Sequence, residues 1–436
     1  MVPRCYLGGR SWKELVTVSS ICSYWRNTFL ATPSIWTRLD GRGVERTRAR
    51  VRRSGALPLQ LIAETGSPDL QVLEVLAPHF SRLNAVVLPC LTAKDRPLIT
   101  HNRFAELLRP SPILRIIQLR ASRASNAPVT VTVDGEFPSL INLLIFGIRI
   151  TFKNLHTPNL THVHISGTFD PMSLLDFLEA SPLLEFLSLV PDYRQDMTTS
   201  TRRKVVLGKL TSLTIFHHGP QILQHLSLPP SGHIKIFEAI SPDQLDRTTS
   251  GRAQLLSQAL DNLPVSRQAN SLSFHTTDIS SVVTLGGPNG TFELDAKKIN
   301  IPTACITLLR LLAQNSSRSI RDLKITKLEL LPRDSQVVSD FVRSLDGLHS
   351  LAMHRASVSP WISALGTSLC PRLQDLAFEY PSPWSADYHL FLGFAKDRSE
   401  AGVPIQRLIV VNRPDDPLDA VRMGVLREYV SRVAWT

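Results

Sequence analysis

Along most of the chain, a short segment recurs in which the first, fourth and sixth positions are apolar. One copy carries Leu184, Leu187 and Leu189. The last two alternate with polar or solvent-compatible residues, which predicts a strand that buries one face. Between the segments lie stretches of about ten to fifteen residues with apolar positions three and four apart, which predict helices, among them 69–80, 303–314 and 418–433. Another predicted helix starts after Asp170, which can cap it, with Pro171 at its first position. The clear segments begin at residues 83, 114, 140, 160, 184, 210, 320, 348, 373 and 405.

The spacing of these segments predicts a repeat. From residue 114 to 210 they begin 26, 20, 24 and 26 residues apart, and from 320 to 405 they begin 28, 25 and 32 apart. A strand-bearing repeat of this length is typical of leucine-rich repeats, in which stacked units form a curved parallel sheet with helices outside. The Asn or Cys that usually closes the segment is mostly absent, so we expect an irregular α/β array over residues 57–436. A doubly wound α/β domain is the alternative, but it does not explain why the segment recurs.

The pattern blurs over residues 230–300. Apolar residues predict strands near 234–237 and 272–274, with a helix over 252–263 between them. The sequence from Gly286 to Gly290 predicts a loop or hairpin turn, and it lacks the Gly-x-Gly-x-x-Gly spacing of a phosphate-binding loop. We therefore expect an irregularity or a break in the array here.

The N-terminal stretch has helical spacing. Leu15, Val18, Cys22, Trp25 and Phe29 step by three, four, three and four, which places them on one face of a helix. Proline at position 33 then stops the helix, and a second tryptophan follows at position 36. An amphipathic helix and turn within an ordinary core is one interpretation.

The second interpretation is a resemblance. The string V-x-x-x-C-x-x-W-R followed by T-P-x-x-W resembles the second half of an F-box, and with the repeats behind it the chain resembles the F-box/leucine-rich-repeat proteins of fungi, in particular of basidiomycetes. The Leu-Pro-x-Glu opening of an F-box has no counterpart before Leu15. We therefore expect residues 1–40 to form a partial F-box-like helical segment.

The resemblance implies a function. Residues 1–40 would hold the Skp-family adaptor of a cullin-based SCF ubiquitin ligase, and the repeats would capture a target protein. The adaptor-interface or module-core residues it implies are Leu15, Val18, Cys22, Trp25, Arg26, Pro33 and Trp36. Of these, Trp25 and Trp36 are expected to stabilise the module more than to touch the adaptor. The alternative is a protein-interaction scaffold without a ligase role that has lost the adaptor-docking helix.

Charge adds a third hypothesis. The net charge is +11, and residues 42–53 carry six arginines against a single glutamate. We expect a solvated helix over residues 41–56 that connects the N-terminal segment to the repeats. The functional alternative is a patch for nucleic acid or an acidic partner, although no aromatic residue interleaves the arginines to stack on bases. Nucleic-acid binding therefore ranks third.

Motifs of catalysis, cofactor binding and metal binding do not occur. The chain lacks nucleophile-elbow, P-loop and His-Glu-x-x-His sequences, so we expect no enzyme activity and no cofactor. Five scattered cysteines without Cys-x-x-Cys spacing indicate reduced thiols and no zinc site. His162 and His164 share one face of a predicted strand, but no third ligand accompanies them.

Two further expectations concern partners and location. Tyr380 and Trp384 follow a repeat strand in a loop, where they could anchor a protein partner or simply pack over the last repeats. The longest apolar run, residues 140–150, is eleven residues long, which is too short to span a membrane. With no signal-peptide-like start, we expect a cytoplasmic or nuclear protein.

Overall fold

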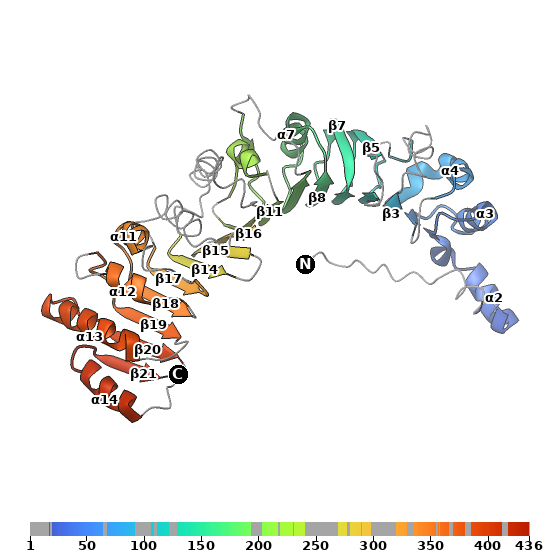
Figure 1. The fold of residues 1–436 in the computed structure, drawn as a ribbon. Coiled ribbons are helices and arrows are strands. Elements are labelled where there is room, and N and C mark those ends of the chain that lie inside the picture. Colours follow the sequence, from blue (N-terminus) through green and yellow to red (C-terminus); the bar gives the residue numbers. More distant parts are fainter. Residues whose placement is uncertain are drawn as a thin grey trace. The chain divides into compact units, whose positions relative to one another are not determined.

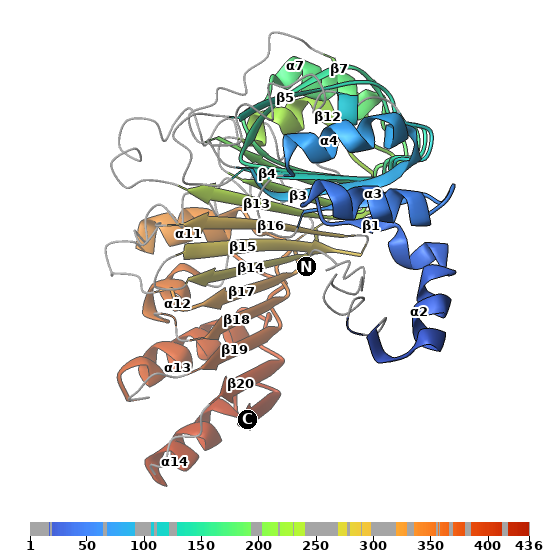
Figure 2. The same ribbon diagram turned by 90° about the vertical axis from the view of Figure 1, so that its right-hand side faces the viewer.

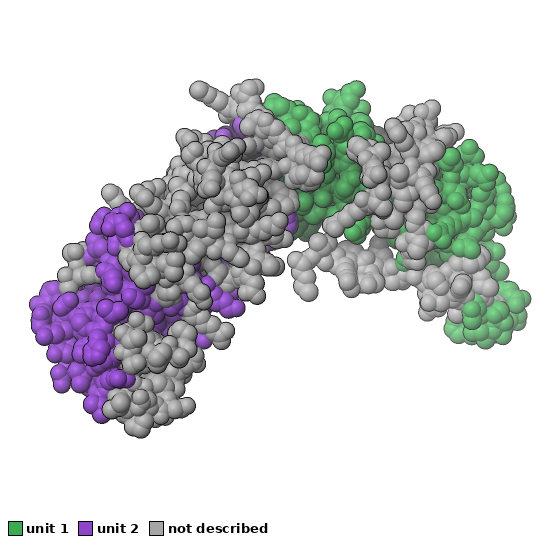
Figure 3. Space-filling view, viewed as in Figure 1, with its two compact units in different colours: residues 1–195, 199–201, 205–209 green, residues 196–198, 202–204, 210–436 purple. Residues whose placement is uncertain are grey.

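The structure is a computed structural model, drawn from two sides in Figures 1 and 2. It describes residues 17, 20–63, 68–91, 106–108, 111–121, 129–192, 203–216, 219–229, 231–239, 269–276, 280–288, 290–297, 320–328, 335–354, 356, 358–365, 369–379, 385–411 and 417–435. The chain forms two compact units (Figure 3). Unit 1 comprises residues 1–195, 199–201 and 205–209, and unit 2 comprises the rest.

Unit 1 alternates short helices with strands. Its helical elements are α2 (Ser23–Leu30), η1 (Pro33–Trp36), α3 (Val44–Arg53), α4 (Leu70–Leu76), η2 (Ala77–Arg82) and α7 (Pro171–Glu179). Its strands are β1 (Arg38–Leu39), β2 (Leu59–Ile62), β3 (Leu83–Leu91), β4 (Ile116–Ala121), β5 (Val129–Glu136), β6 (Asn142–Phe146), β7 (Ile148–His156), β8 (His162–Gly167), β9 (Phe186–Pro191) and β10 (Val205–Val206).

The main sheet of unit 1 is parallel and follows chain order. β1 pairs with β2, then β3, β4, β6, β8 and β9 add one after another. A doubly wound sheet reverses its strand order, and no reversal occurs here. The repeated apolar positions are buried as predicted: Leu143 and Ile145 pair with Val163 and Ile165, and all four are fully buried.

A second, two-stranded parallel sheet was not predicted. β5 and β7 pair with each other and lie, with α3, α4 and α7, on one side of the main sheet (Figures 1 and 2). The apolar run over residues 140–150 therefore contains the end of a turn, the whole of β6 and the first three residues of β7. Gly147 joins them at φ +66, a conformation that glycine adopts without steric cost.

Helix α7 begins as the sequence predicts. The carboxylate of Asp170 accepts a hydrogen bond of 2.7 Å from the backbone N–H of Ser173, and Pro171 occupies the first helical turn. Leu174, Leu175 and Leu178 are fully buried. The cap therefore fixes where the helix starts, and the apolar face attaches it to unit 1.

Unit 2 contains a longer series of strands. Its strands are β11 (Ser212–Phe216), β12 (Leu226–Ser227), β13 (Gly232–Ala239), β14 (Ser271–Thr276), β15 (Ser280–Gly287), β16 (Gly290–Lys297), β17 (Asp322–Thr326), β18 (Ser350–His354), β19 (Asp375–Glu379), β20 (Arg407–Val411) and β21 (Arg432–Trp435). Its helical elements are η4 (Gly219–His225), α11 (Ser335–Arg343), α12 (Ser359–Leu365), α13 (Ser385–Glu400) and α14 (Pro417–Leu426).

The sheet of unit 2 is mostly parallel and has one antiparallel interruption. β11 pairs with β13, β13 with β16, and β14 with β17, all parallel, and β17 to β21 follow in chain order. Between them β15 runs antiparallel to both β14 and β16. Gly287 pairs with Gly290 at the hairpin end, so the predicted turn is confirmed. The expected irregularity within residues 230–300 is this antiparallel strand.

Several predicted helices differ from the structure. The helix expected over 69–80 is α4 followed by the 3-10 helix η2, because Pro78 cannot continue an α-helical hydrogen-bond ladder. The helix expected over 418–433 ends at Leu426 in α14, and the chain then forms β21, which pairs with β20. The helices predicted over 252–263 and 303–314 lie outside the described residues.

The fold class is thus mixed α/β, with mostly parallel strands and several helices. A helix long and apolar enough to cross a membrane does not occur in the described part of the chain.

Candidate functional site

The predicted N-terminal helix face is interrupted. Cys22 has extended backbone angles, φ −159 and ψ 168, and precedes α2 as its N-cap residue. It is exposed, so the prediction that it lies on the buried face of one continuous helix is wrong. Helical spacing specifies which face would be buried, but most of a helix's stability comes from packing of that face. In α2 only Phe29 is buried.

Phe29 and Trp36 form the small core that holds α2. Both are buried, and Ile35 packs against them. The indole Nε1–H of Trp36 donates a hydrogen bond of 3.0 Å to the backbone oxygen of Phe29. From α3, the guanidinium of Arg53 lies 4.5 Å from the centre of the Trp36 ring, a cation–π geometry. Trp36 therefore stabilises the segment, as the sequence predicts.

The other large apolar residues of this segment face solvent. Tyr24 is 73% exposed, Ile21 64%, Trp25 45% and Leu30 40%. Trp25, which is expected to stabilise the module, keeps nearly half of its surface exposed, and its ring lies 6.3 Å from that of Phe29. Tyr24, Trp25 and Leu30 lie on α2, and Ile21 lies just before its N-cap residue. Exposed apolar groups within one short segment mark an interaction surface more often than scattered ones do. We call Ile21, Tyr24, Trp25 and Leu30 the α2 surface.

Two of the remaining predicted site residues, Arg26 and Pro33, are exposed. Arg26 is exposed on α2, and its backbone N–H donates to Cys22. Pro33 is exposed in the first turn of η1, where its missing N–H costs nothing. Leu15, Val18, Tyr380 and Trp384 lie outside the described residues.

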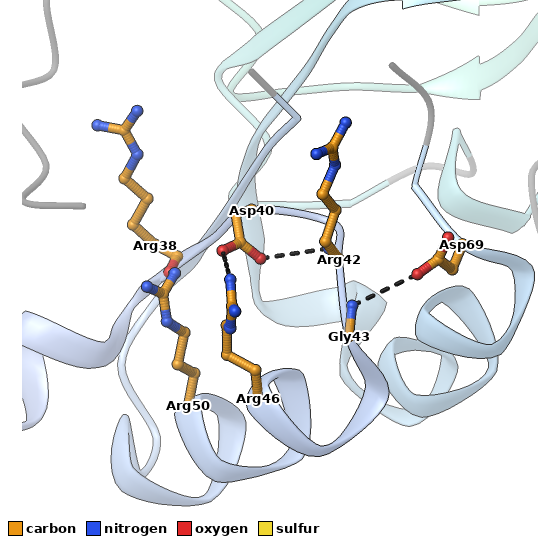
Figure 4. Close-up of polar contacts among 7 residues, drawn as sticks. All are labelled: Arg38, Asp40, Arg42, Gly43, Arg46, Arg50 and Asp69. Atoms are coloured by element: carbon orange, nitrogen blue, oxygen red, sulfur yellow. Dashed lines mark hydrogen bonds and ion pairs between the residues drawn. The ribbon is translucent and has the colours of Figure 1, made fainter. Parts of the chain in front are cut away.

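The arginine-rich helix α3 is only partly solvated. Arg46 pairs with Asp40 at 2.9 Å, and Arg48 forms an exposed ion pair with Glu45. Figure 4 shows Arg46 and Arg50 reaching from α3 toward the strand that carries Arg38 and Asp40. Asp69 accepts a hydrogen bond of 3.4 Å from the backbone N–H of Gly43 just before the helix. The prediction of a wholly solvated connecting helix is thus wrong for part of α3.

Arg50 is the clearest exception. Its side chain is buried and donates to the backbone oxygen of Arg38. Burial lowers the pKa of Arg50, and Asp40 opposes that shift. Because the buried guanidinium donates a hydrogen bond to a backbone carbonyl of β1, it holds β1 against α3. This arginine is therefore structural.

The main sheet of unit 1 has one face without a helix from the described residues. Helices α3, α4 and α7 and the β5–β7 pair lie on the other side (Figures 1 and 2). Along β4, β6, β8 and β9, the residues between the buried positions point to this open face, because side chains alternate along a strand. They include Ile116, Gln118, Arg120, Asn142, Leu144, Phe146, His162, His164, Phe186, Ser188 and Val190. Only Arg120 in this set carries a permanent charge.

Aromatic and imidazole rings stack across these strands. The rings of Phe146 and His164 lie 4.4 Å apart, and those of His162 and Phe186 lie 6.0 Å apart. Nδ1 of His164 forms a hydrogen bond of 2.9 Å with the hydroxyl of Ser188. Burial lowers the pKa of His164 to about 4, so the imidazole is neutral at pH 7. This part of the face therefore presents aromatic and imidazole rings together with aliphatic groups.

The corresponding face of unit 2 carries ion pairs on several strands, beside a stacked pair of rings, Phe216 and Phe237, whose centres lie 4.3 Å apart. Arg407 pairs with Asp375 at 2.8 Å, and His354 lies 3.5 Å from Glu379 on the neighbouring strand. Lys235 also pairs with Glu293 across β13 and β16. Cross-strand pairs of opposite charge stabilise a sheet and leave a polar surface. The two units thus offer partners different chemistry.

Sequence reasoning found the α2 segment but did not identify the ring stack of unit 1. The signal was present, since His162 and His164 are two residues apart and share a strand face. Phe186 pairs in register with His162, whereas Phe146 pairs with Ser166, one open-face position further along β8 than His164. Aligning the repeated segments and reading their intervening positions would have revealed the stack.

The described residues form neither a metal-ligand cluster nor a reactive buried thiol. Among the residues that the structure describes, no three His, Cys, Asp or Glu side chains gather as metal ligands. Burial raises the pKa of Cys370 to about 12, which keeps that thiol protonated and unreactive. No protein-family model matches the chain, and comparison with curated proteins finds no match.

Proposed function

We propose that this chain is a substrate-recognition subunit of an SCF-type ubiquitin ligase, without catalytic activity of its own. In this proposal the α2 surface binds the Skp-family adaptor, and the repeat-bearing units bind a target protein. The proposal rests on the resemblance of residues 15–39 to part of an F-box and of the later segments to leucine-rich repeats. The observation that carries it is the exposure of Ile21, Tyr24, Trp25 and Leu30 around a helix that buries only Phe29.

Energetics support a partner at α2. A helix of eight residues is marginal in water on its own, and most helices gain their stability from a packed apolar face. Burying a large apolar side chain contributes about 1.5–3 kcal/mol. Partner binding that covers Tyr24, Trp25 and Leu30 would thus both order α2 and supply affinity. Aromatic residues are also the commonest anchors of protein interfaces.

The open face of unit 1 is the proposed target-binding surface. Parallel sheets are normally covered on both faces, and here the described helices cover one. The uncovered face carries aliphatic side chains and two ring pairs, Phe146 with His164 and His162 with Phe186. Stacked repeats use such extended faces to bind partners. A target segment with few charges would lose the least hydration there.

The second candidate is a protein-interaction scaffold without a ligase role. One observation favours it: the helix expected across the F-box-like motif is interrupted at Cys22. A scaffold would use the open sheet face in the same way but would not bind the adaptor. The two candidates therefore differ in one measurable interaction.

Adaptor binding by the full chain tests the proposal. We expect the chain to bind a fungal Skp-family adaptor in a calorimetric titration, and Leu30→Ala and Trp25→Ala to weaken that binding by on the order of tenfold or more. The matched control is Leu183→Ala, because Leu183 is 42% exposed and Leu30 is 40% exposed, but Leu183 lies outside α2. Absence of binding by a folded chain would contradict the ligase role and leave the scaffold.

A further inference from the structure

The helical side of unit 1 contains a cleft with a strongly basic lining. It has a volume of about 350 Å³ and lies between α3 and the α4–η2 segment. Arg48, Arg52, His79 and Arg82 line it, together with Val51, Gly55 and Val75. No aspartate or glutamate is among these lining residues, so the cleft concentrates positive charge without a carboxylate inside it.

One of these arginines is fixed in place. Arg82 donates through Nε and Nη2 to the backbone oxygen of Leu57, at 3.2 and 2.8 Å, and through Nη2 to the hydroxyl of Ser54 at 2.9 Å. These bonds hold its guanidinium at the cleft before any ligand arrives. A preorganised group loses less conformational entropy on binding. Arg48 and Arg52, by contrast, are exposed on α3 and able to adjust.

The pKa of His79 is sensitive to the positive charge around it. Its pKa is lowered, first by burial and then by the neighbouring positive charge of Arg82. Burial also lowers the pKa of Arg82. An anion in the cleft would offset both effects. Three guanidiniums and a partly buried imidazole thus line the cleft, and Glu45, which pairs with Arg48, lies outside the lining.

We infer that this cleft binds an acidic peptide segment of a partner protein, carrying at least two carboxylates and a small apolar side chain. The valines form an apolar floor, and the arginines surround it with donors suited to carboxylates. Since the cleft lies on the helical side of unit 1, it is separate from the open sheet face. This inference rests on the proposed role in protein recognition and adds the chemistry of a second contact.

Nucleic acid fits the cleft less well. Its lining offers no Trp, Tyr or Phe for base stacking, and a nucleic-acid groove needs a track of several phosphate contacts. A single hollow with a valine floor matches a short segment of side chains. Nucleic acid and inorganic phosphate are therefore the competitors that the experiment must exclude.

Peptide binding to the full chain tests the inference. The probe is a fluorescent pentapeptide with glutamates on both sides of a central valine, and its counterpart carries glutamines instead. At a salt concentration of about 0.15 M, which screens distant charges, we expect the glutamate peptide to bind at least about tenfold more tightly than the glutamine peptide. The double variant Arg48→Gln/Arg52→Gln should reduce that affinity by on the order of tenfold, while Arg149→Gln, an exposed arginine of β7, should leave it within about twofold.

Three results would overturn the inference. The first is equal binding of the two peptides, and the second is an equal loss with Arg149→Gln, which would show a general charge effect. The third is displacement of the peptide by an equimolar oligonucleotide or by inorganic phosphate, which would assign the cleft to another ligand. Adaptor titration of the unsubstituted chain separates the two proposals: intact adaptor binding without selective binding of the glutamate peptide contradicts only the acidic-peptide site, and the reverse contradicts only the ligase role.

Discussion

At the scale of single residues, two tryptophans with similar sequence contexts have opposite roles. Trp36 is buried and donates its indole hydrogen to the Phe29 carbonyl, whereas Trp25 is 45% exposed. The sequence assigned both to stabilisation because both match the same motif. Exposure depends on which neighbours reach each ring, and a single-sequence pattern contains little of that information.

Removing each ring should therefore have different effects on local stability. Trp36→Ala deletes a packed indole and its hydrogen bond, so we expect residues 23–36 to lose about 3 kcal/mol of protection against local unfolding. Trp25→Ala should change it by less than about 1 kcal/mol. Hydrogen–deuterium exchange of the amides over 23–36 measures both values. Equal effects of the two variants would contradict the assignment of roles.

His164 should make stability depend on pH. Its pKa falls from an ordinary 6.5 to about 4 through burial, so between those pH values the unfolded chain binds a proton that the folded chain does not. Stability should therefore fall as pH drops from 6.5 toward 4, by up to about 3 kcal/mol. Urea denaturation at several pH values measures this slope. His164→Gln should have a shallower slope over that range, and an unchanged slope would assign the effect to other groups.

At the scale of elements, strands were predicted well and helices less well. The segments with Leu143, Val163 and Leu187 formed strands because alternating burial specifies both the element and the face. The residues around Val131 alternate in the same way, yet the expectation of helices between segments hid the β5–β7 sheet. The α2 surface was missed because helical spacing identifies a potential apolar face but not whether another element covers it.

The close approach between the end of β8 and the start of β7 depends on a glycine. Gly167 has φ +142, and a Cβ there would overlap the backbone of Ile148. We expect Gly167→Ala to destabilise the chain by about 2 kcal/mol or more, because backbone must shift to admit it. Gly208→Ala is the matched control in unit 1: its added Cβ meets no atom within 4 Å, so it should change stability by less than about 1 kcal/mol. Thermal denaturation compares the two, and similar melting temperatures would contradict the close-packing argument.

At the scale of the whole molecule, the chain combines surfaces of different chemistry. The α2 surface is apolar, the open face of unit 1 carries pairs of rings, the cleft beside α3 is basic, and the exposed sheet face of unit 2 carries ion pairs. Each one suits a different kind of contact. Such a division fits a protein that brings partners together, since separate surfaces can bind at the same time.

The repeated apolar segments predicted the parallel, chain-ordered strands of unit 1 and of β17–β21 in unit 2, but not the antiparallel β15 between β14 and β16. They did not specify the surfaces with the same success. Binding surfaces depend on side chains that lie between the buried positions, and these do not contribute to the repeat. The arginines of α3 illustrate the difference, since Arg50 is buried against Arg38 while Arg52 lines a cleft.

Hydrogen–deuterium exchange of the full chain, with and without the Skp-family adaptor, tests the central claim most directly. We predict that the adaptor slows amide exchange over residues 20–36, while exchange in β4, β6, β8 and β9 stays the same. Such a result would identify α2 as the docking element and leave the sheet face available for a target. Slower exchange on the sheet strands with no change over 20–36, or no change anywhere in a folded chain, would contradict it.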